Sequence, residues 1–116
     1  LFTQMNDAVA AFVKDLKKAH RFEDVLLFSF SEFGRRVAQN GSNGTDHGTA
    51  NNMFLISGGL KQKCLINPLP ALTALEDGDL KFTVDFKSVY ATILSNWLGT
   101  DDAKILNGTY SKMAFV

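Results

Sequence analysis

Residues that could bind a metal ion or an anion gather in residues 31–51. Glu32 could serve as an oxygen ligand or a general base, and Arg35 or Arg36 could bind a carboxylate or phosphate through two parallel hydrogen bonds. The alternative is that Glu32 pairs with one of these arginines and braces the loop. Residue types and spacing leave both interpretations open.

Asp46 and His47 form the sharper feature of this segment. A carboxylate beside an imidazole, followed by Gly48, which has no side chain, can present oxygen and nitrogen to one divalent metal ion. The alternative is that the Asp46 side chain binds nearby backbone and braces a turn. The glycine-rich residues before Asp46 and the predicted strand nearby favour the metal-binding role.

Two short apolar runs flank the polar segment and are predicted to be strands. Residues 25–30 are apolar on both faces, as in an interior strand of an α/β sheet, and residues 53–57 form a second such run. Between them, residues 34–52 are predicted to form a long loop. In an open α/β sheet, ligands bind where loops follow the carboxyl ends of the strands.

Helices are predicted on both sides of this region. An amphipathic helix covers roughly residues 3–20, and a second helix lies between Asp85, which can cap its start, and Gly99, which can end it. Residues 61–81 have no clear period and contain two prolines, so this part is predicted to be irregular.

The last predicted helix is a short turn near the C-terminus. It covers Asp102 to Leu106, with Asp101 as its cap, and an extended end follows it.

Bulk composition bounds the fold and excludes some functions. With 116 residues, 46% hydrophobic and 21% charged, residues 1–116 are expected to form one domain. Lys+Arg and Asp+Glu both number 12, so no net charge favours nucleic acid. No signal peptide or membrane-spanning run is apparent, and Cys64, the single cysteine, excludes an internal disulfide. Because Leu1 already lies in an amphipathic pattern, we expect a fragment of a longer protein.

The ordered motifs resemble those of a known protein family. From residue 25 onward the chain contains SEFGRR, then NGSNGTDHGTANNMFLISGG, then DGDLKFTVDFKSVYATILSNWLG. This order resembles the C-terminal part of a family of exported bacterial proteins, the uncharacterised domain-of-unknown-function family fifteen-oh-one. Its members are similar to the alkaline phosphatase and sulfatase superfamily, which consists of metal-dependent α/β hydrolases, and many carry twin-arginine export signals.

The resemblance implies an α/β fold: a fragment of an alkaline phosphatase-like sandwich with a mostly parallel sheet flanked by helices. Residues 1–116 would form the C-terminal portion of such a larger domain. The resemblance also implies an exported parent protein in the periplasm or outside the cell. The N-terminal remainder of that parent is then the expected partner.

For the site, the resemblance implies that Glu32 is the acidic metal ligand at a strand end and that His47 is the later histidine ligand. Phe33 stands where the superfamily often has a histidine, so this half of the site would either lack a ligand or take one from Asp46. The metal would be zinc, calcium, magnesium or manganese. Arg35 or Arg36 would bind the anion or steady Glu32.

The implied function is a metal-dependent hydrolase acting on small anionic esters of phosphate or sulfate. Its nucleophile lies N-terminal of this chain in the resemblance, so the chain holds no catalytic nucleophile and is expected to be inactive alone. The alternative is a non-catalytic binding or assembly module that keeps the fold and has lost the site. In that case Asp46 and His47 only brace the loop.

Overall fold

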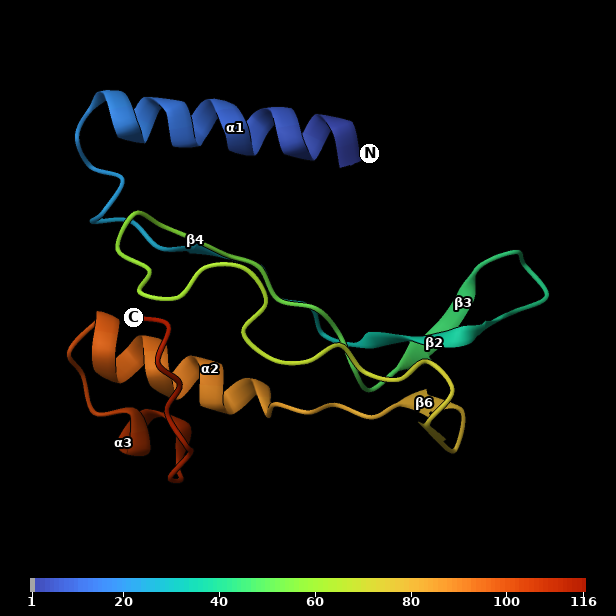
Figure 1. The fold of residues 1–116 in the computed structure, drawn as a ribbon. Helices are drawn as coiled ribbons and strands as arrows, with labels where there is room; N and C mark the ends of the chain where they lie inside the picture. The colour runs from blue at the N-terminus through green and yellow to red at the C-terminus, as the bar shows by residue number, and fades with distance from the viewer. Residues whose placement is uncertain (1) are drawn as a thin grey trace.

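A computed structural model describes residues 2–116 as helices joined by short two-stranded antiparallel sheets (Figure 1). The elements in chain order are α1 (Phe2–Lys18), β1 (Leu27–Phe28), β2 (Gly34–Gln39), β3 (Thr45–Gly48), β4 (Leu55–Ile56), β5 (Leu75–Glu76), β6 (Asp79–Leu80), α2 (Phe86–Thr92), the π-helix η1 (Ile93–Trp97) and α3 (Asp102–Leu106). Strand β1 pairs with β4, β2 with β3, and β5 with β6. The β1–β4 pair lies between α1 and α2, and the other two pairs extend away from the helices (Figure 1).

The predicted fold class is wrong. The described residues contain only antiparallel pairs of strands, and a mostly parallel sheet flanked by helices is not formed. The two apolar runs pair with each other, with Leu27 opposite Ile56 and Phe28 opposite Leu55. The reason lies in the connection: a hairpin returns the chain in the opposite direction, whereas parallel strands need a crossover of a dozen or more residues, usually a helix.

The core lies between α2 and the C-terminal end of the chain. Val89 and Ile93 pack against Phe115 and Val116, and Phe115 is fully buried. The extended end is held in place because Lys61 N donates to Phe115 O at 2.9 Å. Residues 107–116 follow α3 without a further helix or strand, and their last two residues supply half of the buried core cluster.

The predicted second helix is confirmed at both of its ends. Asp85 is the N-cap of α2, and its side chain accepts a hydrogen bond from Lys87 N at 2.8 Å. The helix continues as η1, and Gly99 follows with φ +62°, a left-handed conformation that a glycine adopts without strain. The short predicted helix is also confirmed, because Asp101 caps α3 by accepting from Lys104 N.

The predicted first helix is present as α1, but none of its residues is buried. Val9, Val13 and Leu16 are half-buried, whereas Phe2, Met5 and Phe12 are 78%, 52% and 45% exposed. The apolar face of α1 is therefore only partly covered within the described residues.

The molecule is more open than its length requires. Its accessible surface is 8679 Å², against roughly 6,300 Å² for a compact monomer of 12.8 kDa. The radius of gyration is 16.5 Å, against about 13 Å for a compact chain of this length. Much apolar surface consequently has no partner in these 115 described residues, 2–116.

Candidate functional site

The polar segment between the two apolar runs folds as a hairpin. Residues 34–52 were predicted to form a long loop, and that prediction is wrong for β2 and β3, which pair with Gly34 opposite Gly48 and Arg35 opposite His47. Asn40 starts the turn, since its Oδ1 accepts from Ser42 N and Gly44 N, both at 3.0 Å. An asparagine that binds backbone two residues further on is a local turn signal, so the NGSNG run could have indicated the hairpin.

The base of the hairpin requires glycine. Gly34 is buried, and a Cβ built on it would lie 1.7 Å from Ala50 O. A Cβ on Gly48 would lie 2.8 Å from Asp79 Oδ1 and 2.9 Å from Arg35 C. The strands and the neighbouring β6 can therefore approach closely only because these two positions carry no side chain.

One face of the hairpin presents an imidazole and a guanidinium together. Arg35 and His47 are register partners, and Arg35 Nη1 donates to Thr45 O at 2.7 Å. The His47 ring stacks on Phe33, with ring centroids 3.6 Å apart and an interplanar angle of 20°. Arg35 Cζ lies 5.4 Å from the centroid of the same ring. Phe33 thus fixes the orientation of both groups.

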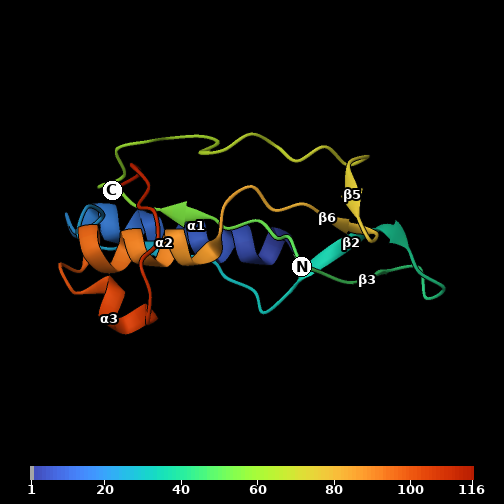
Figure 2. The ribbon, with the colours of Figure 1, turned by 90° about the horizontal axis from the view of Figure 1, so that it is seen from below.

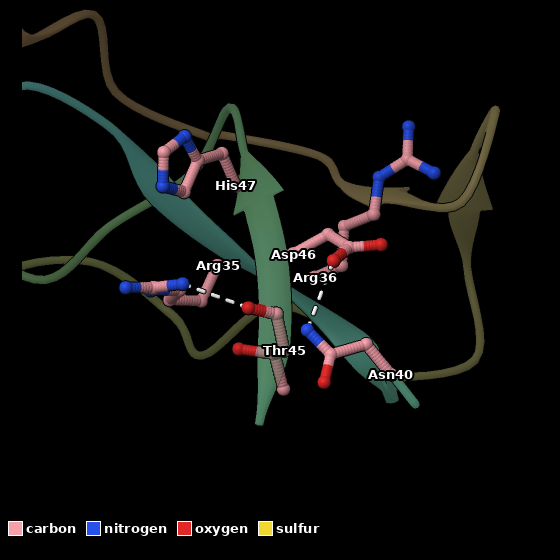
Figure 3. Close-up of a pocket in the computed structure, with 6 residues that line it drawn as sticks. All are labelled: Arg35, Arg36, Asn40, Thr45, Asp46 and His47. Carbon is pink, nitrogen blue, oxygen red and sulfur yellow. Dashed lines mark hydrogen bonds between the residues drawn. The ribbon is translucent and has the colours of Figure 1, made fainter. Parts of the chain in front are cut away.

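The other face carries Asp46 and Arg36. Asn40 Nδ2 donates to Asp46 Oδ1 at 3.0 Å, and Arg36 Nε donates to Asp79 Oδ1 of β6 at 3.2 Å. Figure 3 shows Asp46 and His47 directed to opposite sides of β3, as expected for consecutive residues of a strand.

The hairpin surface has a shallow hollow that extends from the Arg35–His47 pair to the turn. An open concavity of about 470 Å³ is lined by residues of both strands and of the turn: Arg35, Arg36, Asn40, Thr45, Asp46 and His47 (Figure 3). Four of the five charged or imidazole-bearing candidates line it, and Glu32 does not. Glu32 is exposed in the segment just before β2.

The candidate metal ligands are not gathered into one complete set. Among residues 2–116, no group of three or more His, Cys, Asp or Glu side chains is placed to hold a metal ion. Glu32, Asp46 and His47 are all exposed, and the last two lie on opposite faces of β3. Their nitrogen and oxygen donors suit a divalent metal chemically. The metal assignment stays a prediction, and its remaining ligands would have to come from elsewhere.

The structure also shows what binds the two arginines. The partner of Arg36 is the Asp79 carboxylate, and Arg35 bonds to the Thr45 carbonyl; sequence reasoning considered Glu32 for this pairing and did not consider Asp79. The signal for Asp79 was the Asp77-Gly78 pair, a strong turn signal that places β6 directly after β5. The irregular prediction for residues 61–81 holds for the rest of that segment but missed this small hairpin.

A comparison with known protein families shows to which family the chain belongs. The family described as "Protein of unknown function (DUF1501)" matches residues 1–110. The chain belongs to this family. The resemblance seen from residue 25 onward is therefore confirmed, and membership of DUF1501 extends over α1 as well. No curated protein and no solved structure matches this DUF1501 chain.

Membership of DUF1501 leaves the finer implications as predictions. These are the similarity to alkaline phosphatases and sulfatases, the export of the parent, and the metal-dependent chemistry. Of the helices described in residues 2–116, none combines the length and the apolar character needed to cross a membrane.

Proposed function

We propose that this chain supplies an anion-binding and metal-binding hairpin to an exported phosphatase- or sulfatase-like hydrolase. The observation that carries the proposal is the cross-strand pair of Arg35 and His47, which places a guanidinium and an imidazole on one face of β2–β3. A phosphate or sulfate ester is an anion that a guanidinium binds well, and imidazole is a common metal ligand. The two groups thus match the two parts of such a site.

The individual roles follow from the chemistry of the side chains. His47 would be the nitrogen ligand of a divalent metal, with its ring oriented by the stack on Phe33. Arg35 has five N–H donors, of which Thr45 O takes one, so others can bind oxygens of the anion. Glu32, in the exposed segment before β2, would offer carboxylate oxygens to this metal. Asp46 faces the other side of β3 and bonds to Asn40, so in this arrangement it does not join His47.

When bound, the metal would polarise the ester oxygen and stabilise negative charge in the transition state. Of the candidate metals, zinc is the one that suits a site with an imidazole nitrogen, whereas calcium, magnesium and manganese would be held mainly by carboxylate oxygens. The nucleophile and the further ligands would come from the N-terminal remainder of the parent, in the periplasm or outside the cell. This chain alone would then be inactive.

The test compares the full-length parent with its His47→Ala variant. We expect the parent to contain divalent metal and to hydrolyse p-nitrophenyl phosphate or p-nitrophenyl sulfate, and the variant to lose metal and activity. Lys61→Ala is the control, because Lys61 is exposed and contributes only its backbone N–H to the fold. Equal metal content in parent and His47→Ala would refute the assignment of His47.

A non-catalytic binding or assembly module is the second candidate, and the exposed apolar surface favours it. Large apolar patches on soluble proteins mark sites of interaction with other molecules. Phe30, Phe54 and Phe82 are 72%, 62% and 64% exposed, in addition to the open face of α1. A parent without bound metal, without hydrolysis of either ester and without a serine, threonine or cysteine after its first strand would support this role.

A further inference from the structure

Two hairpins far apart in the sequence meet at Arg36 and Asp79. Strand β2 lies beside β6 in both views of the fold (Figure 2). Arg36 Nε lies 3.2 Å from Asp79 Oδ1, and the side chains are 40% and 20% exposed, respectively. This ion pair therefore sits at a partly covered junction between the hairpins.

The backbone around the pair is shaped to let the two hairpins approach. A Cβ on Gly48 would lie 2.8 Å from Asp79 Oδ1, and a Cβ on Gly78 would lie 3.3 Å from Arg36 Nη1. Gly78 also has φ +86°, a conformation that glycine adopts readily and other residues rarely do. A further tie is the bond from Thr49 Oγ1 to Leu80 O at 3.2 Å. These contacts form a brace between β6 and the β2–β3 hairpin.

The brace should stabilise the β2–β3 hairpin and orient its side chains. A single two-stranded hairpin is marginally stable in water and needs a further strand or a packing partner. The register of β2 against β3 shifts between Arg35 and Gln39, and Arg36 lies in this irregular stretch. Figure 3 shows Arg35 and Arg36 directed to opposite sides, so holding Arg36 against β6 leaves Arg35 on the side of His47.

We propose that Asp79 is a positioning residue: through Arg36 it fixes the hairpin so that Arg35 faces His47. Arg36 is then a structural arginine, and Arg35 is the arginine that meets the anion. The part that concerns the brace stands on the contacts alone, whereas the part that concerns the anion rests on the proposed function. The proposal thus assigns anion binding to Arg35 and a structural role to Arg36, whereas the sequence left either arginine as the anion ligand.

The brace is tested by amide hydrogen exchange of the full-length parent. In Asp79→Ala, the amides of β2 and β3 should exchange about two- to five-fold faster, the range for a partly exposed ion pair, while those of α2 keep their rates. Glu76→Ala is the matched control, because Glu76 is exposed in the same small hairpin and lies opposite Asp79. Unchanged hairpin exchange in Asp79→Ala overturns the proposal.

A double-mutant cycle separates the brace from general damage to the fold. If Asp79 acts through Arg36, Arg36→Gln should loosen the hairpin as Asp79→Ala does, and the double variant should be no looser than either one. Asp79→Glu, which keeps the charge, should restore most of the protection. Effects that add in the double variant, or a loss of protection throughout the molecule in all three, contradict the proposed role.

Kinetics of the parent on p-nitrophenyl phosphate and sulfate test the anion-facing arginine. Arg35→Ala should raise KM more than Arg36→Gln does, and Asp79→Glu should keep the KM of the parent. A larger rise in KM for Arg36→Gln than for Arg35→Ala overturns the assignment of Arg35 as the anion-binding arginine. A parent that hydrolyses neither ester refutes the proposed function and, with it, the role of Arg35, while the exchange experiment still decides the role of Asp79.

Discussion

At the scale of single residues, the base of the β2–β3 hairpin has no room for a methyl group at Gly34. A Cβ there would overlap the carbonyl of Ala50, so β2 and the segment that follows β3 would have to move apart. We expect Gly34→Ala to lower the free energy of unfolding by about 1–3 kcal/mol, as for other overpacked sites. Urea unfolding measures this change. Gly41→Ala is the control, since no atom lies within 4 Å of a Cβ built there, and an equal loss in both variants would contradict the packing explanation.

Lys112 partners a buried carboxylate. Asp102 is 7% exposed, its Oδ1 lies 3.1 Å from Lys112 Nζ, and its Oδ2 has no hydrogen-bond partner. Removing the lysine would leave a buried charge without its counter-ion, so Lys112→Ala should destabilise the chain by about 1–3 kcal/mol. Lys63→Ala, at an exposed position, should change the free energy of unfolding little. Thermal or urea unfolding distinguishes the two outcomes.

Tyr110 shifts the titration of Lys87. The hydrogen bond from Lys87 Nζ to the Tyr110 hydroxyl, at 3.1 Å, raises the pKa of Lys87 above its ordinary value of 10.5. A lysine whose pKa is raised by folding contributes stability that is fully present below pH 10.5 and is lost as pH rises through the folded pKa.

We therefore expect Tyr110→Phe to return the pKa of Lys87 toward 10.5, as measured by NMR titration of its side chain. The difference in stability between the parent chain and this variant should shrink at high alkaline pH. Tyr90→Phe is the control, because the contacts of Tyr90 are with the rings of Phe28 and Phe86. An unchanged Lys87 titration in Tyr110→Phe would show that the hydroxyl is not the cause.

At the scale of elements, α2 carries the core and begins at a single capping side chain. Asp85→Ala removes the acceptor for Lys87 N and should cost about 1 kcal/mol, with some loss of helical circular dichroism. Asp85→Asn keeps an acceptor oxygen and should retain most of the stability. If alanine and asparagine destabilise equally, the charge of Asp85 rather than its cap would be the important property.

The helices were predictable because their signals are local. The apolar spacing of α1 and α2, the caps Asp85 and Asp101, and Gly99 all act within a few residues of chain. The sheets were not, because an apolar run does not specify which strand it pairs with or in which direction. Only the path of residues 31–52 makes β1 and β4 antiparallel.

The candidate site shows the same division. Sequence reasoning selected Arg35, Arg36, Asp46 and His47, and the structure places all four along one concavity. The sequence alone did not show that Asp46 and His47 point to opposite faces, because that follows from their lying in a strand. Asp79 was missed because it is 43 residues away from Arg36 and only tertiary packing brings them together.

At the scale of the whole molecule, the exposed apolar face of α1 should cause the chain to self-associate. Phe2 and Phe12 are 78% and 45% exposed on a helix with no buried residue. We expect the isolated chain to bind a hydrophobic dye such as ANS and to self-associate. Replacing both residues by serine should reduce both effects, as followed by fluorescence and sedimentation. Lys14→Ser together with Lys18→Ser, at exposed positions of the same helix, is the control.

The sequence by itself determined the family, the helices with their caps, and the set of residues able to do chemistry, because each depends on residue types and short-range spacing. The tertiary structure decided the antiparallel pairing, the burial of Phe115 and Val116 against α2, and which arginine faces His47. These depend on where the chain turns and on contacts between distant residues. Residue types and short-range spacing do not specify such contacts. They form only when the elements pack together, with glycines where two backbones come closest.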